Sequence, residues 1–104
     1  MNETLFLPLK AKWYDMIESG VKTEEYREIK EYWIKRFIRK ECLTHFLVDK
    51  DDFKEFDKVV FSLGYTHKTM TFEIENFSIG TGKPEWGAEP NKKYFVIKLG
   101  RRLK

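Results

Sequence analysis

The hydrophobic residues of this chain follow two spacings, which together predict four strands and two helices, and a charged segment after the first helix adds a fifth strand. Apolar side chains two residues apart, as one face of a strand requires, predict strands at Thr4–Lys10, Lys58–Gly64, Thr69–Ile79 and Tyr94–Leu99. Apolar side chains three and four apart predict helices at Ala11–Ser19 and Lys30–Lys40. Gly20 suits the left-handed position just beyond a helix end.

The two predicted helices each have one apolar stripe. In the first helix the expected buried residues are Trp13, Met16 and Ile17. In the second helix Trp33 and Phe37 are four apart, and so are Ile34 and Ile38. The rest of its surface is basic, with Lys35, Arg36, Arg39 and Lys40. Such a surface could contact nucleic-acid phosphate, but a solvated face around a core-facing stripe is more common and is the interpretation that we favour.

Three further segments have weaker patterns. Glu41–Val48 extends the second helix or forms a short strand. Asp49–Asp57 is acidic and reads as a loop or short helix anchored by Phe53 and Phe56. Gly80–Lys93 is rich in glycine, proline and charge, and long loops of this kind in small domains are usually functional or disordered. Pro8 cannot donate to a strand ladder, so the first strand should lie at an edge or an irregularity.

The segment from Gly20 to Glu28 is too charged for an ordinary structural strand. If it is extended, its side chains alternate between two faces. Thr23, Glu25 and Arg27 then share one face, and the other carries Lys22, Glu24, Tyr26 and Glu28. Whichever face turns inward carries ions, and a buried ion is costly unless it is paired or bound. We therefore expect this strand to line a polar site.

The spacing Gly-x-Lys-x-x-Glu-x-Arg, formed by Gly20, Lys22, Glu25 and Arg27, resembles the signature of the ASCH family. That family is a branch of the PUA-like superfamily of small β-barrels linked to RNA and modified nucleosides. The resemblance implies an α+β fold, a mostly antiparallel barrel of about five strands with two flanking helices, formed by residues 1–104 as one domain. The stretch Pro84–Ala88 also resembles one in short ASCH proteins of bacteria and their phages.

Lys22, Glu25 and Arg27 are the leading candidates for a site. Glu25 and Arg27 lie about 6–7 Å apart along one strand face, so the arginine can grip a phosphate or carbonyl while the glutamate accepts from an amine. A lysine in a partly dry pocket can also act as a base. The alternative is a structural network of ion pairs, and the spacing alone leaves both open.

The resemblance leaves two functions open, a binding module and a small hydrolase. Some ASCH members act as amidohydrolases on acylated cytidine nucleosides, with a threonine nucleophile at the position that Glu25 occupies here. This departure favours binding of a nucleotide, a nucleoside or a short single-stranded RNA. In the hydrolase alternative Lys22 and Glu25 are the acid and base. Trp86 either stacks on a base or caps the barrel, and Tyr65 is a further stacking candidate.

Composition limits these possibilities. The chain has 104 residues, a formal net charge of +3 and 16% aromatic residues, so a small ligand or short strand suits it better than long nucleic acid. The single Cys42 fits a reducing, cytoplasmic location, and no apolar run is long enough to span a membrane. His45 and His67 have no partner at metal-binding spacing, and no phosphate or dinucleotide fingerprint occurs, so we expect neither metal nor cofactor.

Overall fold

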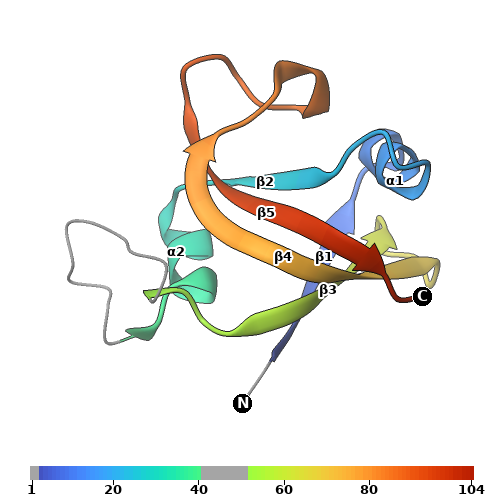
Figure 1. Ribbon diagram of the computed structural model, residues 1–104, viewed down its shortest axis with the longest axis horizontal. Helices are drawn as coiled ribbons and strands as arrows, with labels where there is room; N and C mark the ends of the chain where they lie inside the picture. The colour runs from blue at the N-terminus through green and yellow to red at the C-terminus, as the bar shows by residue number, and fades with distance from the viewer. Residues whose placement is uncertain (1–2, 41–51) are drawn as a thin grey trace.

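The computed structural model describes residues 3–40 and 52–104, which form one five-stranded sheet and two helices (Figure 1). Within the sheet the strand order is β1-β3-β4-β5-β2, so β1 and β2 are the outer strands. The elements follow one another along the chain as β1 (Glu3–Leu9), α1 (Ala11–Glu18), β2 (Glu24–Glu28), α2 (Glu31–Phe37), β3 (Phe56–Leu63), β4 (Thr69–Thr81), the 3-10 helix η3 (Pro84–Trp86) and β5 (Lys93–Arg102).

The sheet is mixed and strongly curved. β1 pairs with β3 in parallel, and the other three pairings are antiparallel. The 13-residue β4 has two register irregularities between Phe72 and Asn76, and such bulges bend a strand and increase its twist. Figure 1 shows the sheet curled into a half-barrel. The predicted α+β class with a barrel-like, mostly antiparallel sheet is therefore confirmed, and Pro8 lies on an outer strand as expected.

The core lies inside the curled sheet, and strand alternation predicted most of it. Phe37 of α2 lies among the strand residues, its ring centroid 4.8 Å from that of Phe77 and 5.2 Å from that of Phe95. Each of the four strands predicted from apolar alternation contributes its apolar face to this core: Leu5, Leu7 and Leu9 from β1, Val59 and Phe61 from β3, Met70 and Phe72 from β4, and Phe95, Ile97 and Leu99 from β5.

The buried face of α1 differs from the prediction. Tyr14 and Ile17 are the buried residues of this helix, whereas Trp13 and Met16 are half-buried. The helix packs Tyr14 and Ile17 onto the main core and turns Met16 toward a second apolar cluster around Trp86. The expected end of the helix is confirmed, since Gly20 has a φ of 86° and its N–H donates to the carbonyl of Ile17 over 3.1 Å.

The connections explain the remaining differences. α2 ends at Phe37, because Ile38 is already extended and forms a bridge with Phe53. The predicted long loop is shortened at its start, since β4 continues to Thr81, and η3 lies inside it. The ambiguous segment Glu41–Val48 lies outside the described residues. No helix in the described ranges is long and apolar enough to cross a membrane.

Candidate functional site

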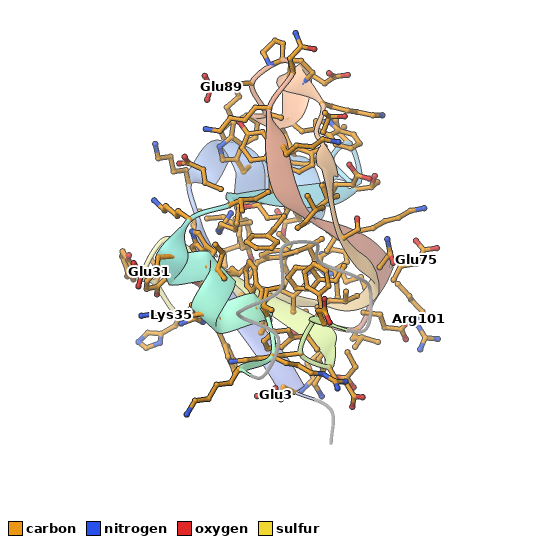
Figure 2. The ribbon with its side chains drawn as sticks, turned by 90° about the vertical axis from the view of Figure 1, so that its left-hand side faces the viewer. Glu3, Glu31, Lys35, Glu75, Glu89 and Arg101 are labelled. Carbon is orange, nitrogen blue, oxygen red and sulfur yellow. The ribbon has the colours of Figure 1, made fainter. Side chains whose placement is uncertain are left out.

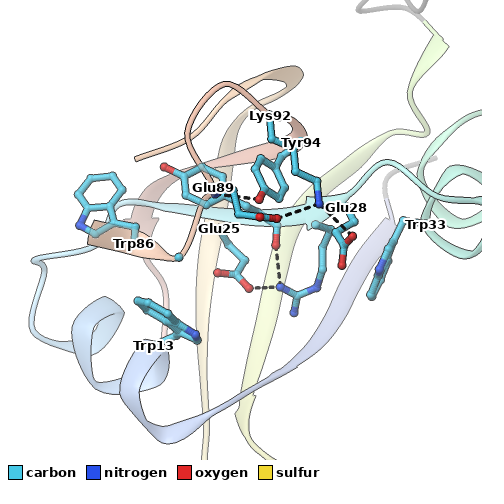
Figure 3. Close-up of a pocket in the computed structure, with 11 residues that line it drawn as sticks. Trp13, Glu25, Glu28, Trp33, Trp86, Glu89, Lys92 and Tyr94 are labelled. Carbon is cyan, nitrogen blue, oxygen red and sulfur yellow. Dashed lines mark hydrogen bonds and ion pairs between the residues drawn. The ribbon is translucent and has the colours of Figure 1, made fainter. Parts of the chain in front are cut away.

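A cavity of about 310 Å³ opens beside the outer strand β2 (Figure 3). Side chains from α1, β2, α2, η3 and the approach to β5 meet there, although they are distant in the sequence. All three tryptophans of the chain are among the lining residues. The full lining comprises Trp13, Glu25, Tyr26, Arg27, Glu28, Trp33, Trp86, Gly87, Glu89, Lys92 and Tyr94.

The strand β2 brings Glu25 and Arg27 to the wall of this cavity. Among the described residues it pairs with β5 alone, and in that pairing Glu25 lies opposite Ile97 and Arg27 opposite Phe95. Because β2 is an outer strand, side chains on both of its faces reach the cavity. Glu25 is buried and Arg27 half-buried, and their side chains form an ion pair (Figure 3).

Lys22 lies behind this wall and not on it. Its side chain is 0% exposed, and Nζ lies 2.9 Å from Oε1 of Glu25 and donates to the carbonyl of Glu24. The predicted alternation of Lys22 with Glu25 across the strand is wrong, because β2 begins only at Glu24. The preceding chain is held instead by α1, where the Lys22 N–H donates to the carbonyl of Met16 over 3.0 Å.

The ammonium of Lys22 is the most strongly desolvated charge near the cavity. Burial lowers the pKa of Lys22, and the neighbouring carboxylate of Glu25 opposes that shift in part. The same ammonium lies 4.8 Å from the ring centroid of Tyr26. Such a charge is tolerated inside a protein only because it is paired, which makes Glu25 the essential neighbour.

Arg27 joins the two outer strands. Its Nη1 pairs with Oε2 of Glu25 and donates to the carbonyl of Tyr26 over 3.0 Å. Its Nη2 donates to the carbonyl of Pro8 in β1 over 3.2 Å, and its Cζ lies 5.2 Å from the ring centroid of Trp33. A guanidinium carries five N–H donors, so these three contacts with described residues leave two donors for another molecule.

Trp86 belongs both to an apolar cluster and to the cavity wall, and its stacking on a base stays a prediction. It is buried against a cluster that includes Tyr26, Ala88 and Tyr94, and it also contributes to the cavity wall. The hydroxyl of Tyr26 connects this cluster to β2, since it donates to Oε1 of Glu24 over 2.8 Å and accepts from the N–H of Lys83 over 3.0 Å. Burial raises the pKa of that hydroxyl.

Tyr65 is not part of this cavity. It lies in the turn between β3 and β4, is 97% exposed, and borders a separate hollow that shares only Trp33 with the cavity. The structure thus brings together Glu25, Arg27 and Trp86, with Lys22 directly behind them, and leaves Tyr65 apart.

The rim of the cavity contains an ion cluster that sequence reasoning missed. Nζ of Lys92 lies 3.2 Å from Oε2 of Glu28 and 3.2 Å from Oε2 of Glu89 (Figure 3). These carboxylates raise the pKa of Lys92. The N–H of Glu89 donates to the hydroxyl of Tyr94 over 2.9 Å, which fixes the loop beside β5. The Glu89–Lys92 spacing was a weak signal, and Glu28 was recognised as part of the charged strand but not as a partner of Lys92.

Trp13 and Trp33 were also missed, because helical spacing assigned both to the core. Both are only half-buried and line the cavity from α1 and α2. A useful signal was present in their position, since these two large aromatics lie on the helices directly before and after the charged strand.

The site combines hydrogen-bonding groups of opposite kind with aromatic walls. A carboxylate that accepts and a guanidinium that donates stand side by side, which suits a planar ligand edge carrying a donor next to an acceptor. Residues 3–40 and 52–104 contain no group of three or more side chains suited to holding a metal ion. Comparison of the chain with family models, with curated proteins and with solved structures finds no match.

Proposed function

We propose that this chain is a PUA-like binding module of the ASCH type that holds a nucleotide derivative, a nucleoside or one base of a short single-stranded RNA. The observation that carries the proposal is the Glu25–Arg27 pair on the wall of a cavity that all three tryptophans line. Each base has a π-face that stacks on aromatic side chains, worth about 1–3 kcal/mol per base. The paired charges select among bases by their edges.

The size of the cavity supports a small ligand. Its volume of about 310 Å³ lies at the lower end of the roughly 300–1,000 Å³ that small-molecule sites occupy. Its wall carries three carboxylates, Glu25, Glu28 and Glu89, against the two cations Arg27 and Lys92. This balance disfavours a phosphate inside the cavity, so the base or nucleoside part of the ligand enters it.

One observation favours the alternative hydrolase, namely the lowered pKa of Lys22. A neutral amine is the form that accepts a proton. However, Lys22 is 1% exposed and absent from the cavity wall, and a general base must come within hydrogen-bond reach of the proton that it takes. Both oxygens of Glu25 are already held by Lys22 and Arg27, so a fixed acceptor in a binding site is the better interpretation.

A thermal-shift screen against nucleosides, nucleotides and short single-stranded RNAs tests the proposal. A ligand at about 100 times its Kd stabilises the folded state by about 2.7 kcal/mol, which raises Tm by roughly 10–20 °C for a domain of this size. Ligands that shift Tm are then incubated with the protein and examined for conversion, which separates binding from hydrolysis. If none of these compounds shifts Tm at millimolar concentration, the proposal is rejected.

A further inference from the structure

A second, open hollow of about 700 Å³ lies next to the cavity and shares Trp33 with it. It lies between β1, α2 and the turn between β3 and β4, and its lining includes Phe6, Tyr32, Trp33, Tyr65, Lys30 and Arg36. Figure 2 looks toward α2, on the side of the molecule that carries the labelled Glu31 and Lys35.

Exposed aromatic side chains are concentrated in this hollow. Among the described residues the exposed large aromatics are Phe6 (63%), Tyr32 (58%) and Tyr65 (97%), and all three line it. Phe6 points outward because Leu5 and Leu7 occupy the inward face of β1. Scattered exposed apolar residues need no explanation, but a gathered set on a small domain marks an interaction surface.

The charge of the hollow is opposite to that of the cavity. Its lining includes Lys30 and Arg36 and no acidic residue. The guanidinium carbon of Arg36 lies 5.6 Å from the ring centroid of Tyr32 and 5.7 Å from that of Trp33. Cations and aromatic faces therefore alternate over one surface, which is the arrangement that single-stranded nucleic acids bind, with bases on the rings and phosphates on the cations.

We propose that this hollow binds the continuation of a single-stranded nucleic acid whose neighbouring base occupies the cavity. This inference rests on the proposed function, since the cavity is the site for the first base and Trp33 connects the two. The cavity excludes phosphate by its excess of carboxylates, whereas the hollow offers Lys30 and Arg36 to the phosphodiesters. An acidic peptide would use the cations but would leave the faces of Phe6, Tyr32 and Tyr65 without a matching partner.

The test measures binding of a labelled six-nucleotide RNA by fluorescence anisotropy. Tyr32→Ala/Tyr65→Ala should weaken this binding by roughly 5- to 100-fold for each stacked base lost, while binding of a single nucleoside, measured by calorimetry, stays unchanged. Lys30→Ala/Arg36→Ala should also weaken hexamer binding, and each lost phosphate contact should reduce the slope of log K against log salt by about 0.7.

Matched controls come from β5 and the chain end. Lys98→Ala removes an exposed cation that pairs with Glu75 at 3.8 Å, and Leu103→Ala removes a side chain of an exposed residue. Neither residue lines the hollow, so hexamer affinity should stay within two-fold of the unmodified protein's, about the scatter expected of neutral surface changes. Because Tyr32 and Tyr65 are exposed, their replacement should leave Tm unchanged, which shows that the variants are folded.

The outcomes separate this inference from the proposed function. If a nucleoside binds, but the hexamer binds no more tightly than the nucleoside and its affinity is unchanged in the variants of the hollow, the inference is overturned and the cavity proposal stands. If the hexamer depends on Tyr32 and Tyr65 but not on Glu25, and no nucleoside binds, the hollow stands and the cavity proposal fails. If poly-glutamate displaces the labelled hexamer as effectively as unlabelled hexamer does, nucleic acid is the wrong choice of ligand for the hollow. Absence of binding to both probes overturns both. A DNA hexamer shows whether the ribose hydroxyls are read.

Discussion

The carboxylate of Glu25 is shared between two cations, each on a different oxygen. Lys22 is enclosed and Arg27 reaches across to β1, so the same side chain contributes to stability and to the chemistry of the cavity. A carboxylate oxygen has two acceptor sites, and each oxygen of Glu25 therefore retains capacity for a ligand donor. Stability and binding can be separated only by measuring both in one variant.

We expect Glu25→Gln to lower both ligand affinity and Tm. The substitution keeps the size of the side chain but presents an NH₂ group to one of two cations, which costs about 1–3 kcal/mol in stability and a similar amount in affinity. Urea denaturation and calorimetric titration measure the two effects. Glu89→Gln is the control, since its carboxylate is on the same cavity wall but is 72% exposed and should change stability by less than about 0.5 kcal/mol.

A fall of about 10²–10⁴-fold in turnover, with affinity retained, would instead identify Glu25 as a general base. Unchanged Tm together with unchanged binding would contradict every role given to this residue here.

Two buried tyrosines provide a matched comparison of hydroxyl groups. Tyr14 is 0% exposed, and its hydroxyl has no hydrogen-bond partner among the described residues. The hydroxyl of Tyr94 accepts from the N–H of Glu89 over 2.9 Å. Replacing an unsatisfied buried hydroxyl relieves its desolvation cost, whereas replacing a satisfied one leaves its partner unpaired.

We therefore expect Tyr14→Phe to leave the free energy of unfolding unchanged or to raise it by up to about 1 kcal/mol, and Tyr94→Phe to lower it by about 0.5–1.5 kcal/mol. Denaturant unfolding of the two variants side by side is the measurement. If Tyr14→Phe lowers stability more than Tyr94→Phe does, the hydroxyl of Tyr14 has a hydrogen-bond partner after all and the expectation is wrong.

At the scale of elements, the approach of η3 to β2 depends on one glycine. A Cβ on Gly82 would lie 2.7 Å from Cβ of Ala88 and 2.7 Å from Cζ of Tyr26. The tyrosine ring cannot move aside easily, because its hydroxyl is held by Glu24 and Lys83. The segment that positions Trp86 would have to shift instead.

We expect Gly82→Ala to cost about 1–3 kcal/mol in stability, as overpacking does, and to weaken ligand binding because Trp86 moves. Gly80→Ala is its control, since a Cβ there meets nothing within 4 Å and should leave stability within about 0.5 kcal/mol of the original. The comparison uses Tm and a binding titration for each variant. Equal effects of the two substitutions would show that close packing at Gly82 is not what holds η3.

The elements themselves were largely predictable from sequence, but the residues of the site only in part. Alternation identified the inward faces of β1 and β5, because one side chain in two must be buried wherever a sheet covers a core. It also placed Glu25 and Arg27 on one face of β2. Alternation failed for Lys22, which precedes the strand and is positioned by α1. Such a contact depends on the packing of a helix, and local spacing does not encode it.

The missed residues show the same limit at longer range. Helical spacing places Trp13 on an apolar stripe, but it does not determine how α1 is rotated about its axis. That rotation depends on the packing of Tyr14 into the main core. Lys92 meets Glu28 only because β5 pairs with β2, across 64 positions of the chain. Tyr65 and Trp86 were both aromatic residues on loops, and only the folded sheet separates them into different hollows.

At the scale of the whole molecule, the buried ammonium of Lys22 should make stability depend on alkaline pH. Its pKa is lowered in the folded protein and is about 10.4 in an unfolded chain. Between these two values the unfolded state binds more protons, so the free energy of unfolding rises with pH. The stability associated with a neutral Lys22 is fully present above the unfolded value and is lost as pH falls through the folded one.

Lys22→Met should remove this contribution. Denaturant unfolding of both proteins between about pH 8 and 10 should show a difference in stability that moves in favour of the parent chain as pH rises. The raised pKa of Tyr26 acts in the opposite direction only above about pH 10, so the comparison is confined to pH values below that. Parallel curves over the whole range would contradict the shift.

The tryptophan fluorescence of this protein comes from a single place. The chain contains three tryptophans, and each of them borders the same cavity, so no indole elsewhere adds a constant background. A base stacked on any of these rings changes the polarity around it and opens a route for quenching. The unlabelled chain is thus its own optical sensor, and replacing Trp13, Trp33 and Trp86 by phenylalanine one at a time divides the signal among the three walls.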